Sequence, residues 1–311
     1  MPKDPKRIEE LKKKYGSKAI ENAERLNPKG FPALLDWRDE MDPHYTKLWL
    51  DFTYGGLYTR GVLDERTRHL VVTSQFVVQD EMEYLRSHLY SAVEHAKPRE
   101  VLEIMLQATV YVGYPKGARA AYMLREVLIE LGRLDEITKT QLPLDGTNSK
   151  RSKEQERGSW RVPDDKFPER EQYMEKYGWG GISAGIRLQP THHVQTLRRF
   201  DRVDPNFLKH WLDFIYDGMY VRGVLDDKTR ILCVVGQCVA LDEMVQGENH
   251  IRAALALGAT PREVQEVAVQ STQYWGMPRS LRAMSILERI LREQNRLSEL
   301  TETQLPMPAA K

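Results

Sequence analysis

Three polar side chains on one predicted helix have the types and the spacing that acid–base chemistry requires. Glu81, Tyr84 and His88 follow one another at intervals of three and four residues within a helix predicted over residues 80–96. At 100° per residue they form one row along the edge of an apolar face. At such a border a carboxyl group loses hydration, which raises its pKa, and an imidazole can exchange protons near neutral pH. The row is suited to proton transfer on a small carbanion or enolate.

The same pattern occurs a second time further along the chain. Glu243 and His250 repeat the acid and the imidazole 162 residues after Glu81 and His88, and Gln246 takes the middle position. Apolar residues continue this edge beyond His250, which predicts that His250 lies deeper than His88. A Glu and a His at the border of an amphipathic helix also commonly form surface hydrogen bonds. A shared packing requirement would preserve them in both copies equally well, so both interpretations stay open.

Arginine and aromatic residues near the two rows are candidates for substrate binding. Arg60 and Arg222 each follow an aromatic-rich segment and are candidates to hold a substrate carboxylate. Pairing with a nearby aspartate or capping a helix is the alternative for both arginines. Aromatic residues at helical spacing belong more often to a core than to a binding surface. Four of them are nevertheless candidates to contact a planar substrate: Trp49, Tyr58, Tyr111 and Tyr274.

Metal and thiol chemistry have little support in the sequence. His192, His193 and His210 lie near two aspartates, but no ligand spacing typical of zinc or iron emerges, and we predict no metal site. Cys233 and Cys238 are the two cysteines of the chain and lie five residues apart in an apolar segment. We expect both to be core residues and not a disulfide framework.

The segments that position these residues occur twice along the chain. Tyr58-Thr-Arg-Gly-Val-Leu-Asp64 recurs as Tyr220-Val-Arg-Gly-Val-Leu-Asp226, and Trp49-Leu-Asp-Phe52 recurs as Trp211-Leu-Asp-Phe214. The unit is far longer than a solenoid repeat of roughly 20–50 residues, so it indicates a duplicated domain. We predict a first repeat over residues 1–143, a polar linker over 144–171 and a second repeat over 172–311.

Each repeat is expected to be helical throughout. Asp64 is a suitable N-cap for a helix over 66–79, and a second helix follows over 80–96. Pro98 suits the first turn of a third helix that ends near Val112, and a fourth covers about 116–132. Alternation of apolar and polar residues at period two is never sustained. The predicted fold class is all-α, a helical bundle present twice.

Composition and charge argue against several classes of protein. The 311 residues contain 46 Lys+Arg and 45 Asp+Glu, a formal net charge of +1, which does not favour a nucleic-acid-binding surface. Apolar runs fall short of the about 20 residues that a membrane span needs. The charged start has no apolar stretch behind it, unlike a secretory signal. We therefore expect a cytoplasmic protein that binds neither nucleic acid nor membranes.

Together these motifs resemble the carboxymuconolactone decarboxylase family, whose fold is shared with the AhpD-like alkylhydroperoxidases. The first copy carries Arg60-Gly-Val-Leu-Asp-x-x-Thr-Arg68, Leu85-Arg-Ser-His-Leu89 and Tyr111-Val-Gly-Tyr-Pro115. The second copy carries Arg222 with Thr229-Arg230, then His250, then Tyr274-Trp-Gly-Met-Pro278. The resemblance implies an all-helical fold and a homo-oligomer. For a fused pair of repeats it implies a trimer with pseudo-sixfold symmetry.

The chemistry that the resemblance implies depends on two cysteine positions. The peroxidase branch needs Cys-x-x-Cys, and those positions hold Glu81 and Tyr84 in the first copy and Glu243 and Gln246 in the second. Without a thiolate there is no sulfenic acid and no disulfide cycle. The resemblance then points to the decarboxylase branch, which uses no metal and no organic cofactor. The sequence departs from that branch in three ways: Tyr84 replaces an acidic residue, the family's Arg-Pro-Gly entry reads Arg-Gly without the proline, and the second copy lacks Leu-Arg before His250.

The sequence therefore predicts a cofactor-free lyase, with a decarboxylase as the leading candidate, acting on a small carboxylated lactone or aromatic-derived acid. In the first repeat His88 would deliver or relay the proton, Glu81 would orient the imidazole or act as the acid, and Tyr84 would donate a hydrogen bond to the oxyanion. In the second repeat His250 and Glu243 would take the first two roles. An isomerase, a lactone hydrolase or a non-catalytic binding or assembly module are the alternatives. The first repeat is the preferred active one.

Overall fold

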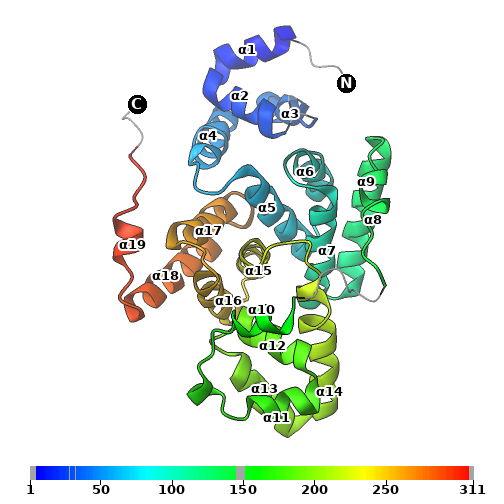
Figure 1. The fold of residues 1–311 in the computed structure, drawn as a ribbon. Helices are drawn as coiled ribbons and strands as arrows, with labels where there is room; N and C mark the ends of the chain where they lie inside the picture. The colour runs from blue at the N-terminus through cyan, green and yellow to red at the C-terminus, as the bar shows by residue number, and fades with distance from the viewer. Residues whose placement is uncertain (1–4, 28, 32, 145–150, 308–311) are drawn as a thin grey trace.

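The protein is built from helices arranged as two copies of one unit. The computed structural model describes residues 5–27, 29–31, 33–144 and 151–307, and every regular element in these ranges is helical. Four helices of each repeat form a central bundle (Figure 1). In the first repeat they are α5 (Glu65–Gln79), α6 (Met82–His95), α7 (Pro98–Val112) and α8 (Tyr114–Glu130). In the second they are α15 (Asp227–Leu241), α16 (Met244–Ala256), α17 (Pro261–Trp275) and α18 (Met277–Glu293). The predicted all-α fold class is confirmed.

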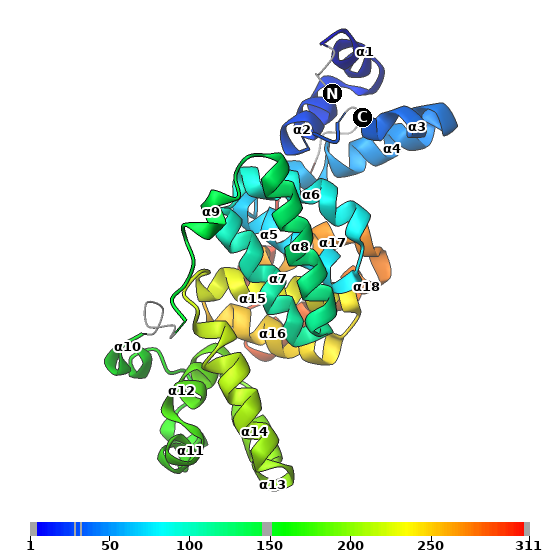
Figure 2. The ribbon, with the colours of Figure 1, turned by 90° about the vertical axis from the view of Figure 1, so that its right-hand side faces the viewer.

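Two helical arms extend from opposite ends of this bundle, as Figures 1 and 2 show. The first arm consists of α1 (Pro5–Tyr15), α2 (Ser17–Leu26), α3 (Ala33–Met41), α4 (Pro43–Thr53) and η1 (Leu57–Thr59). The second arm contains α11 (Arg170–Tyr177), α12 (Trp179–Leu188), α13 (His193–Val203), α14 (Pro205–Trp211), η3 (Leu212–Tyr216) and η4 (Met219–Val221). Short helices α9 (Asp135–Thr138) and α19 (Ser298–Thr301) follow the two halves of the bundle. Each arm has a hydrophobic core of its own, separate from that of the bundle.

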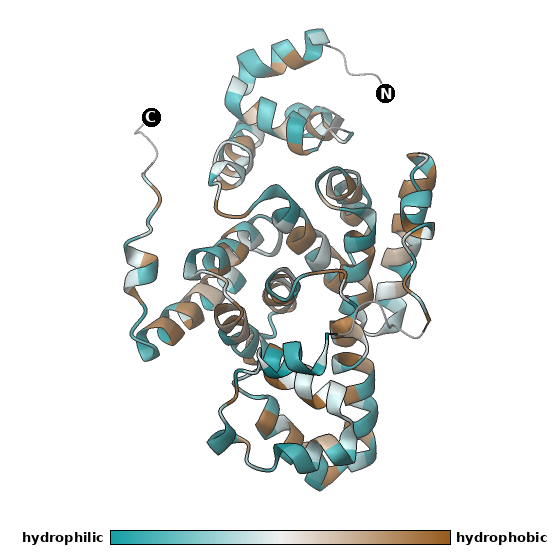
Figure 3. Ribbon diagram, viewed as in Figure 1, coloured by the Kyte–Doolittle hydropathy of each residue, from teal (hydrophilic) through white to brown (hydrophobic). Residues whose placement is uncertain are grey.

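The stretch predicted as a polar linker contains structure. Residues 145–150 lie outside the described residues, but α10 (Lys153–Arg157) and η2 (Asp164–Lys166) follow them. Glu156 is buried and accepts a hydrogen bond from Arg187 Nε at 2.8 Å, and Phe167 is buried in the core of the second arm. In Figure 3 α10 carries the polar colour, whereas the apolar colour lies along the central helices. A few apolar anchors and one buried ion pair hold this polar stretch on the second arm.

Helices α5 and α15 pack on each other at the centre and join the two repeats in one core. The Gln75 side chain donates from Nε2 to the Gly236 carbonyl at 3.2 Å and to Ser271 Oγ at 2.6 Å, both in the second repeat. A Cβ atom on Gly236 would lie 2.8 Å from Cγ1 of Val71, so glycine permits this close approach. The two halves of the bundle therefore share one hydrophobic core.

Aspartates set the boundaries of both central helices. Asp64 accepts from the Thr67 backbone N–H at 2.9 Å and begins α5, and Asp226 begins α15 in the same way. Asp80 and Asp242 end the two helices in the left-handed conformation, with φ of 64° and 60°. Aspartate tolerates this conformation better than most residues do. The turn that it forms makes Glu81 the N-cap residue of α6 and Glu243 that of α16.

Buried ion pairs cross between the repeats. Arg222 Nε and Arg230 Nη2 each donate to the carboxylate of Glu103 on α7 at 2.9 Å. In the equivalent arrangement Arg60 Nε donates to Glu266 on α17 at 2.8 Å, and both glutamates are fully buried. This differs from the expectation that Arg60 and Arg222 hold a substrate carboxylate. The carboxylate that each one binds belongs to the other repeat of the protein.

Candidate active site

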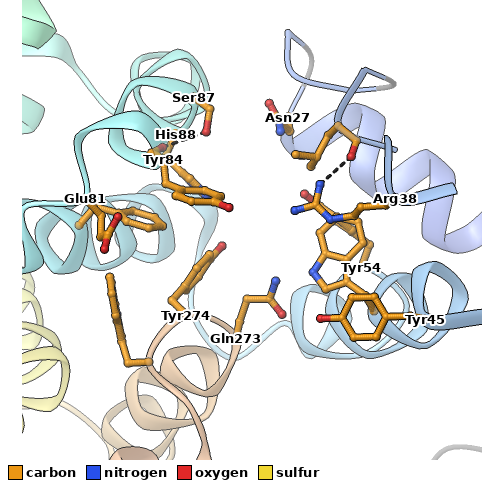
Figure 4. A pocket seen from close by; sticks show the side chains of 14 residues that line it. Asn27, Arg38, Tyr45, Tyr54, Glu81, Tyr84, Ser87, His88, Gln273 and Tyr274 are labelled. Carbon is orange, nitrogen blue, oxygen red and sulfur yellow. Dashed lines mark hydrogen bonds between the residues drawn. The ribbon is translucent and has the colours of Figure 1, made fainter. Parts of the chain in front are cut away.

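A cavity of about 370 Å³ lies where α6, the first arm and the end of α17 meet (Figure 4). The Glu–Tyr–His row of α6 lines one side of it, together with Ser87. The first arm lines the opposite side with Arg38, Trp49 and Tyr54 among others. The second repeat completes the cavity with the last residues of α17, Gln273, Tyr274 and Trp275. This first pocket is therefore formed by both repeats and by an arm.

The structure brings the three predicted residues of the first row to this one pocket. Glu81, Tyr84 and His88 all line it, because Glu81 caps α6 and the other two lie on its first two turns. The side chain of Glu81 is exposed at the mouth, so the desolvation that we expected for its carboxyl group is absent. Tyr84 is 46% exposed, its ring stacks on that of Phe76 with the two centroids 6.2 Å apart, and its hydroxyl faces the cavity (Figure 4).

His88 is enclosed by aromatic rings. Its ring centroid lies 4.7 Å from that of Phe76 and 5.4 Å from that of Tyr274, whose plane is nearly perpendicular at 83°. Burial among these rings penalises the charged form and lowers the pKa of His88 to about 4. Within the described residues its imidazole forms no hydrogen bond to another protein group. At neutral pH His88 is therefore an uncharged imidazole whose polar atoms are free for a ligand.

The tyrosine beside His88 comes from the other repeat. Tyr274 extends from the end of α17 into the first pocket, and its hydroxyl forms a short hydrogen bond with that of Tyr58. Burial raises the pKa of Tyr274 well above its usual value of 10, so its hydroxyl keeps its proton. Tyr58 is buried and does not belong to the lining of the cavity. Trp49 and Tyr274 line the first pocket and Tyr58 contacts Tyr274, while substrate binding by these residues stays a prediction.

A second pocket of about 600 Å³ occupies the equivalent place in the second repeat. Glu243, Gln246 and His250 line it from α16, and Tyr111 reaches into it from α7 of the first repeat. His250 is 6% exposed, so the prediction that it lies deeper than His88 is confirmed. Burial, with a smaller contribution from His192, lowers the pKa of His250 to about 3. The two pockets are thus related by the duplication, and each takes a tyrosine from the opposite repeat.

The two imidazoles differ in their hydrogen bonds. The Gln189 amide donates from Nε2 to Nδ1 of His250 at 2.8 Å, which leaves the imidazole proton on Nε2. That Nε2 lies 3.3 Å from the Tyr111 hydroxyl, so both ring nitrogens of His250 are engaged. The residue equivalent to Gln189 in the first repeat is Asn27, whose shorter side chain accepts from the Gly30 backbone N–H instead. Hydrogen bonds therefore hold the imidazole of His250, whereas ring contacts alone hold that of His88 among the described residues.

Comparison with known proteins identifies the family. The family model described as "Carboxymuconolactone decarboxylase family" matches residues 43–126 and, a second time, residues 205–289. The two segments together cover more than half of the chain and contain both Glu/His rows. The chain belongs to the carboxymuconolactone decarboxylase family. The tandem two-repeat organisation is confirmed by the same pair of matches.

The chain is also similar to a curated protein whose name gives no activity. It is the "Uncharacterized 15.0 kDa protein in nqo9-nqo10 intergenic region" of Paracoccus denitrificans. The two are 27% identical over 101 residues, which is 32% of this chain and 75% of that protein. The similarity therefore supports the fold and leaves the reaction to be proposed from the site.

The two thiols of this family member lie away from the positions that a peroxidase would use. Cys233 and Cys238 are both buried and unpaired on α15, as expected of core residues. Burial raises the pKa of each thiol to about 12, so neither forms a thiolate at neutral pH. Among the described residues, His, Cys, Asp and Glu side chains form no cluster of three or more that could hold a metal ion. None of the described helices combines the length and the apolar character of a membrane span.

Buried neutral histidines predict that the protein loses stability in mild acid. Burial lowers the pKa of His69, His88, His193 and His250 below the usual 6.5, to about 3 for the last two. Below pH 6.5 the unfolded chain therefore binds more protons than the folded one. The stabilisation is complete above pH 6.5 and is lost as the pH falls towards these lowered values. Between pH 7 and pH 5 we expect a loss of roughly 2 kcal/mol from each of His88, His193 and His250.

Urea unfolding at pH 7 and pH 5 measures this effect. His193 is fully buried and its ring nitrogens have no hydrogen-bond partner, so His193→Phe should reduce the difference between the two pH values. His44 is exposed, and His44→Gln is the matched control that should leave the difference unchanged. Equal unfolding free energies at pH 7 and pH 5 for the unmodified protein would contradict the prediction.

Proposed function

We propose that this protein is a cofactor-free lyase that removes CO₂ from a small carboxylated lactone or aromatic-derived acid in the first pocket. The observation that carries the proposal is the environment of His88. An uncharged imidazole without protein hydrogen bonds borders a cavity of about 370 Å³ that is also lined by tyrosine hydroxyls and one guanidinium group. A planar acid of modest size would fit such a cavity, with its rings against the aromatic walls.

Decarboxylation leaves an electron pair that the pocket must stabilise. The bond between the carboxylate carbon and the rest of the substrate breaks, CO₂ leaves, and the electron pair stays behind as a dienolate. Its negative charge gathers on a carbonyl oxygen, where a hydrogen bond from a positioned hydroxyl group stabilises the transition state most. Tyr274 keeps its proton and lines the cavity next to His88, and Tyr84 presents a second hydroxyl there. We assign the stabilisation of the oxyanion to these two tyrosines.

The carbon that loses CO₂ then takes up one proton. His88 is uncharged in the ligand-free pocket, because burial lowers its pKa to about 4. The negative charge of a bound substrate raises the pKa of a neighbouring imidazole, so His88 would acquire its proton in the complex and pass it to the carbon. Glu81 is exposed at the mouth of the pocket and would exchange protons with solvent. One proton is consumed for each CO₂ released from a carboxylate.

The first pocket is the preferred active one. In the second pocket Gln189 and Tyr111 occupy both ring nitrogens of His250, so the imidazole must give up a hydrogen bond before it can transfer a proton. Glu243 and His250 would serve the same chemistry there only after this rearrangement. We therefore propose slower turnover, or binding alone, in the second repeat.

An assay of two products on one sample tests the reaction. Chelator-treated protein is mixed with 4-carboxymuconolactone, hydroxylated aryl-propenoic acids and lactone acids, and ultraviolet absorbance and CO₂ are recorded together. We expect CO₂ release that does not depend on added metal. A change in absorbance without CO₂ would replace the lyase by an isomerase or a lactone hydrolase. Ligand binding without turnover on any of these acids would favour a binding module.

We also propose that the chain assembles with copies of itself. Three apolar side chains of α4, Tyr45, Leu48 and Phe52, are spaced by three and four residues and are between 41% and 58% exposed. The second arm exposes Phe207 and Phe214 at the positions equivalent to the first and last of them. Such apolar faces are typical of protein–protein contacts.

Light scattering after size exclusion measures the assembly. The family resemblance predicts a trimer, so the expected mass is about three times that of the 36.1 kDa chain. Phe52→Ser and Phe214→Ser together should lower that mass, and the exposed change Tyr122→Ser on α8 is the control. A monomer at micromolar concentration would contradict the proposal.

A further inference from the structure

We infer that Arg38, on α3 of the first arm, binds the carboxylate of the ligand in the first pocket and restricts this pocket to anionic ligands. The segments matched by the family begin at residue 43, so Arg38 lies outside them. The inference rests on the proposed function for the identity of the reaction, but anion binding can be measured without turnover. It gives the first arm a role in choosing the substrate.

The lining of the cavity carries one positive and one negative side chain. Among the described residues that line it, Arg38 and Glu81 are the charged ones, and His88 is uncharged. Figure 4 shows Glu81 and Arg38 on opposite sides of the cavity. A carboxylate that enters is repelled by Glu81 and has one cation to bind, so it turns towards the arm.

The guanidinium group of Arg38 is held in place by contacts that leave its positive charge without a counter-ion among the described residues. Its Nη1 donates to the Leu34 carbonyl at 2.6 Å, and its guanidinium carbon lies 4.5 Å and 4.8 Å from the ring centroids of Trp37 and Trp49. The described residues offer it no carboxylate within ion-pair distance. Arg60 and Arg68, by contrast, face the buried carboxylate of Glu266. A positioned guanidinium with unused donors is suited to a carboxylate.

A residue that lines the same cavity carries an unpaired donor. The indole N–H of Trp275 is buried, lacks a hydrogen-bond partner and belongs to a residue that lines the first pocket. A buried donor without a partner carries a free-energy cost that a ligand acceptor can remove. A ligand with a carboxylate for Arg38 and a carbonyl or hydroxyl oxygen for Trp275 matches both groups. An aryl-propenoic or lactone acid has this pair.

The second repeat supplies an independent comparison. The residue equivalent to Arg38 is Phe200, but Arg199 next to it lines the second pocket, with its guanidinium carbon 5.9 Å from the Phe200 ring centroid. Packing inherited from the duplication would have kept the arginine at one position. Helix α3 of the first arm and the equivalent helix α13 of the second arm each place an arginine at a pocket, but from positions that differ by one residue. This indicates that both pockets require a cation.

Calorimetric binding of an acid and of its amide tests the inference. The probes are 4-hydroxycinnamate and 4-hydroxycinnamamide, and the protein carries Arg199→Gln so that the second pocket lacks its own arginine. Adding Arg38→Gln should weaken binding of the acid by about tenfold or more and change the affinity for the amide by less than about twofold. Arg38→Lys should restore part of the lost affinity, because the charge returns without the planar fork.

Each outcome decides the inference. Circular dichroism and thermal unfolding must be unchanged in Arg38→Gln, and the unchanged affinity for the amide shows that the pocket is intact. Equal effects on acid and amide, an unaffected acid, or failure of the acid to bind would overturn the role of Arg38. Binding of the acid that depends on Arg38, together with no CO₂ from any acid, would overturn the lyase and leave the inference standing.

Discussion

Replacing His88 with glutamine is expected to lower kcat for CO₂ release by about 10²- to 10⁴-fold, the range typical of losing a positioned proton donor. Glutamine keeps a hydrogen-bonding side chain of similar size but cannot transfer a proton. His88 borders the first pocket and has no other polar partner among the described residues. Binding of a substrate analogue should change much less than kcat, because Arg38 and the aromatic walls remain.

His250→Gln is the matched control, since it makes the same change in the second pocket. We expect it to lower total turnover by less than about tenfold, because both nitrogens of His250 are already engaged by Gln189 and Tyr111. A larger loss in His250→Gln than in His88→Gln would transfer the active site to the second repeat. Equal and complete losses would show that the two pockets work only together.

Removing the carboxylate of Glu103 is expected to lower the free energy of unfolding by about 3–5 kcal/mol. Glu103 and Arg230 are fully buried, and the Glu103 carboxylate also binds Arg222. In Glu103→Leu the Arg230 guanidinium would stay buried without a counter-ion. Because this ion pair joins α7 to the second repeat, the variant should weaken the contact between repeats and not one helix alone.

Urea unfolding of two variants separates this effect from a general effect of removing charge. Glu288→Gln is the control, because Glu288 and Arg292 form an ion pair on α18 at 2.6 Å with side chains that are 50% and 63% exposed. An exposed pair of this kind contributes less than about 1 kcal/mol. Similar losses in Glu103→Leu and Glu288→Gln would contradict the account of the inter-repeat ion pairs.

Local signals in the sequence predicted the helices of the bundle well. Asp64 and Pro98 are strong signals for the starts of α5 and α7, and the predicted ends at Gln79 and Val112 agree with the structure. The helix predicted over residues 80–96 begins two residues late, since Asp80 adopts the left-handed conformation and Glu81 becomes the cap. That shift explains why Glu81 is exposed at the mouth of the pocket.

Contacts between distant parts of the chain could not be predicted from one sequence. Arg60 and Glu266 are 206 residues apart, so no local pattern connects them. The sequence predicts that Tyr111 and Tyr274 bind substrate. That each of them lines the pocket of the opposite repeat depends on how α5 and α15 pack, which the sequence does not reveal. Arg38 was missed because it belongs to no motif shared by the two repeats: the position 162 residues further along holds Phe200.

The duplication allows each residue of the first repeat to be compared with its equivalent in the second repeat. Comparing positions 162 residues apart gives Asn27 and Gln189, a pair that differs by one methylene group. Gln189 reaches the imidazole of His250 at 2.8 Å, whereas Asn27 accepts from the Gly30 backbone N–H within its own arm. A sequence comparison alone finds the pair, but its meaning needs the position of the imidazole.

The fate of a labelled carboxylate tests the central claim most directly. The acid that gives turnover is prepared with ¹³C in its carboxyl group and incubated with chelator-treated protein, and carbon NMR follows the label. The account predicts that the label appears as CO₂ and bicarbonate with the unmodified protein and with His250→Gln, and at least about a hundredfold more slowly with His88→Gln. Label that stays in an isomerised or hydrolysed acid, or label released equally fast by His88→Gln, would contradict it.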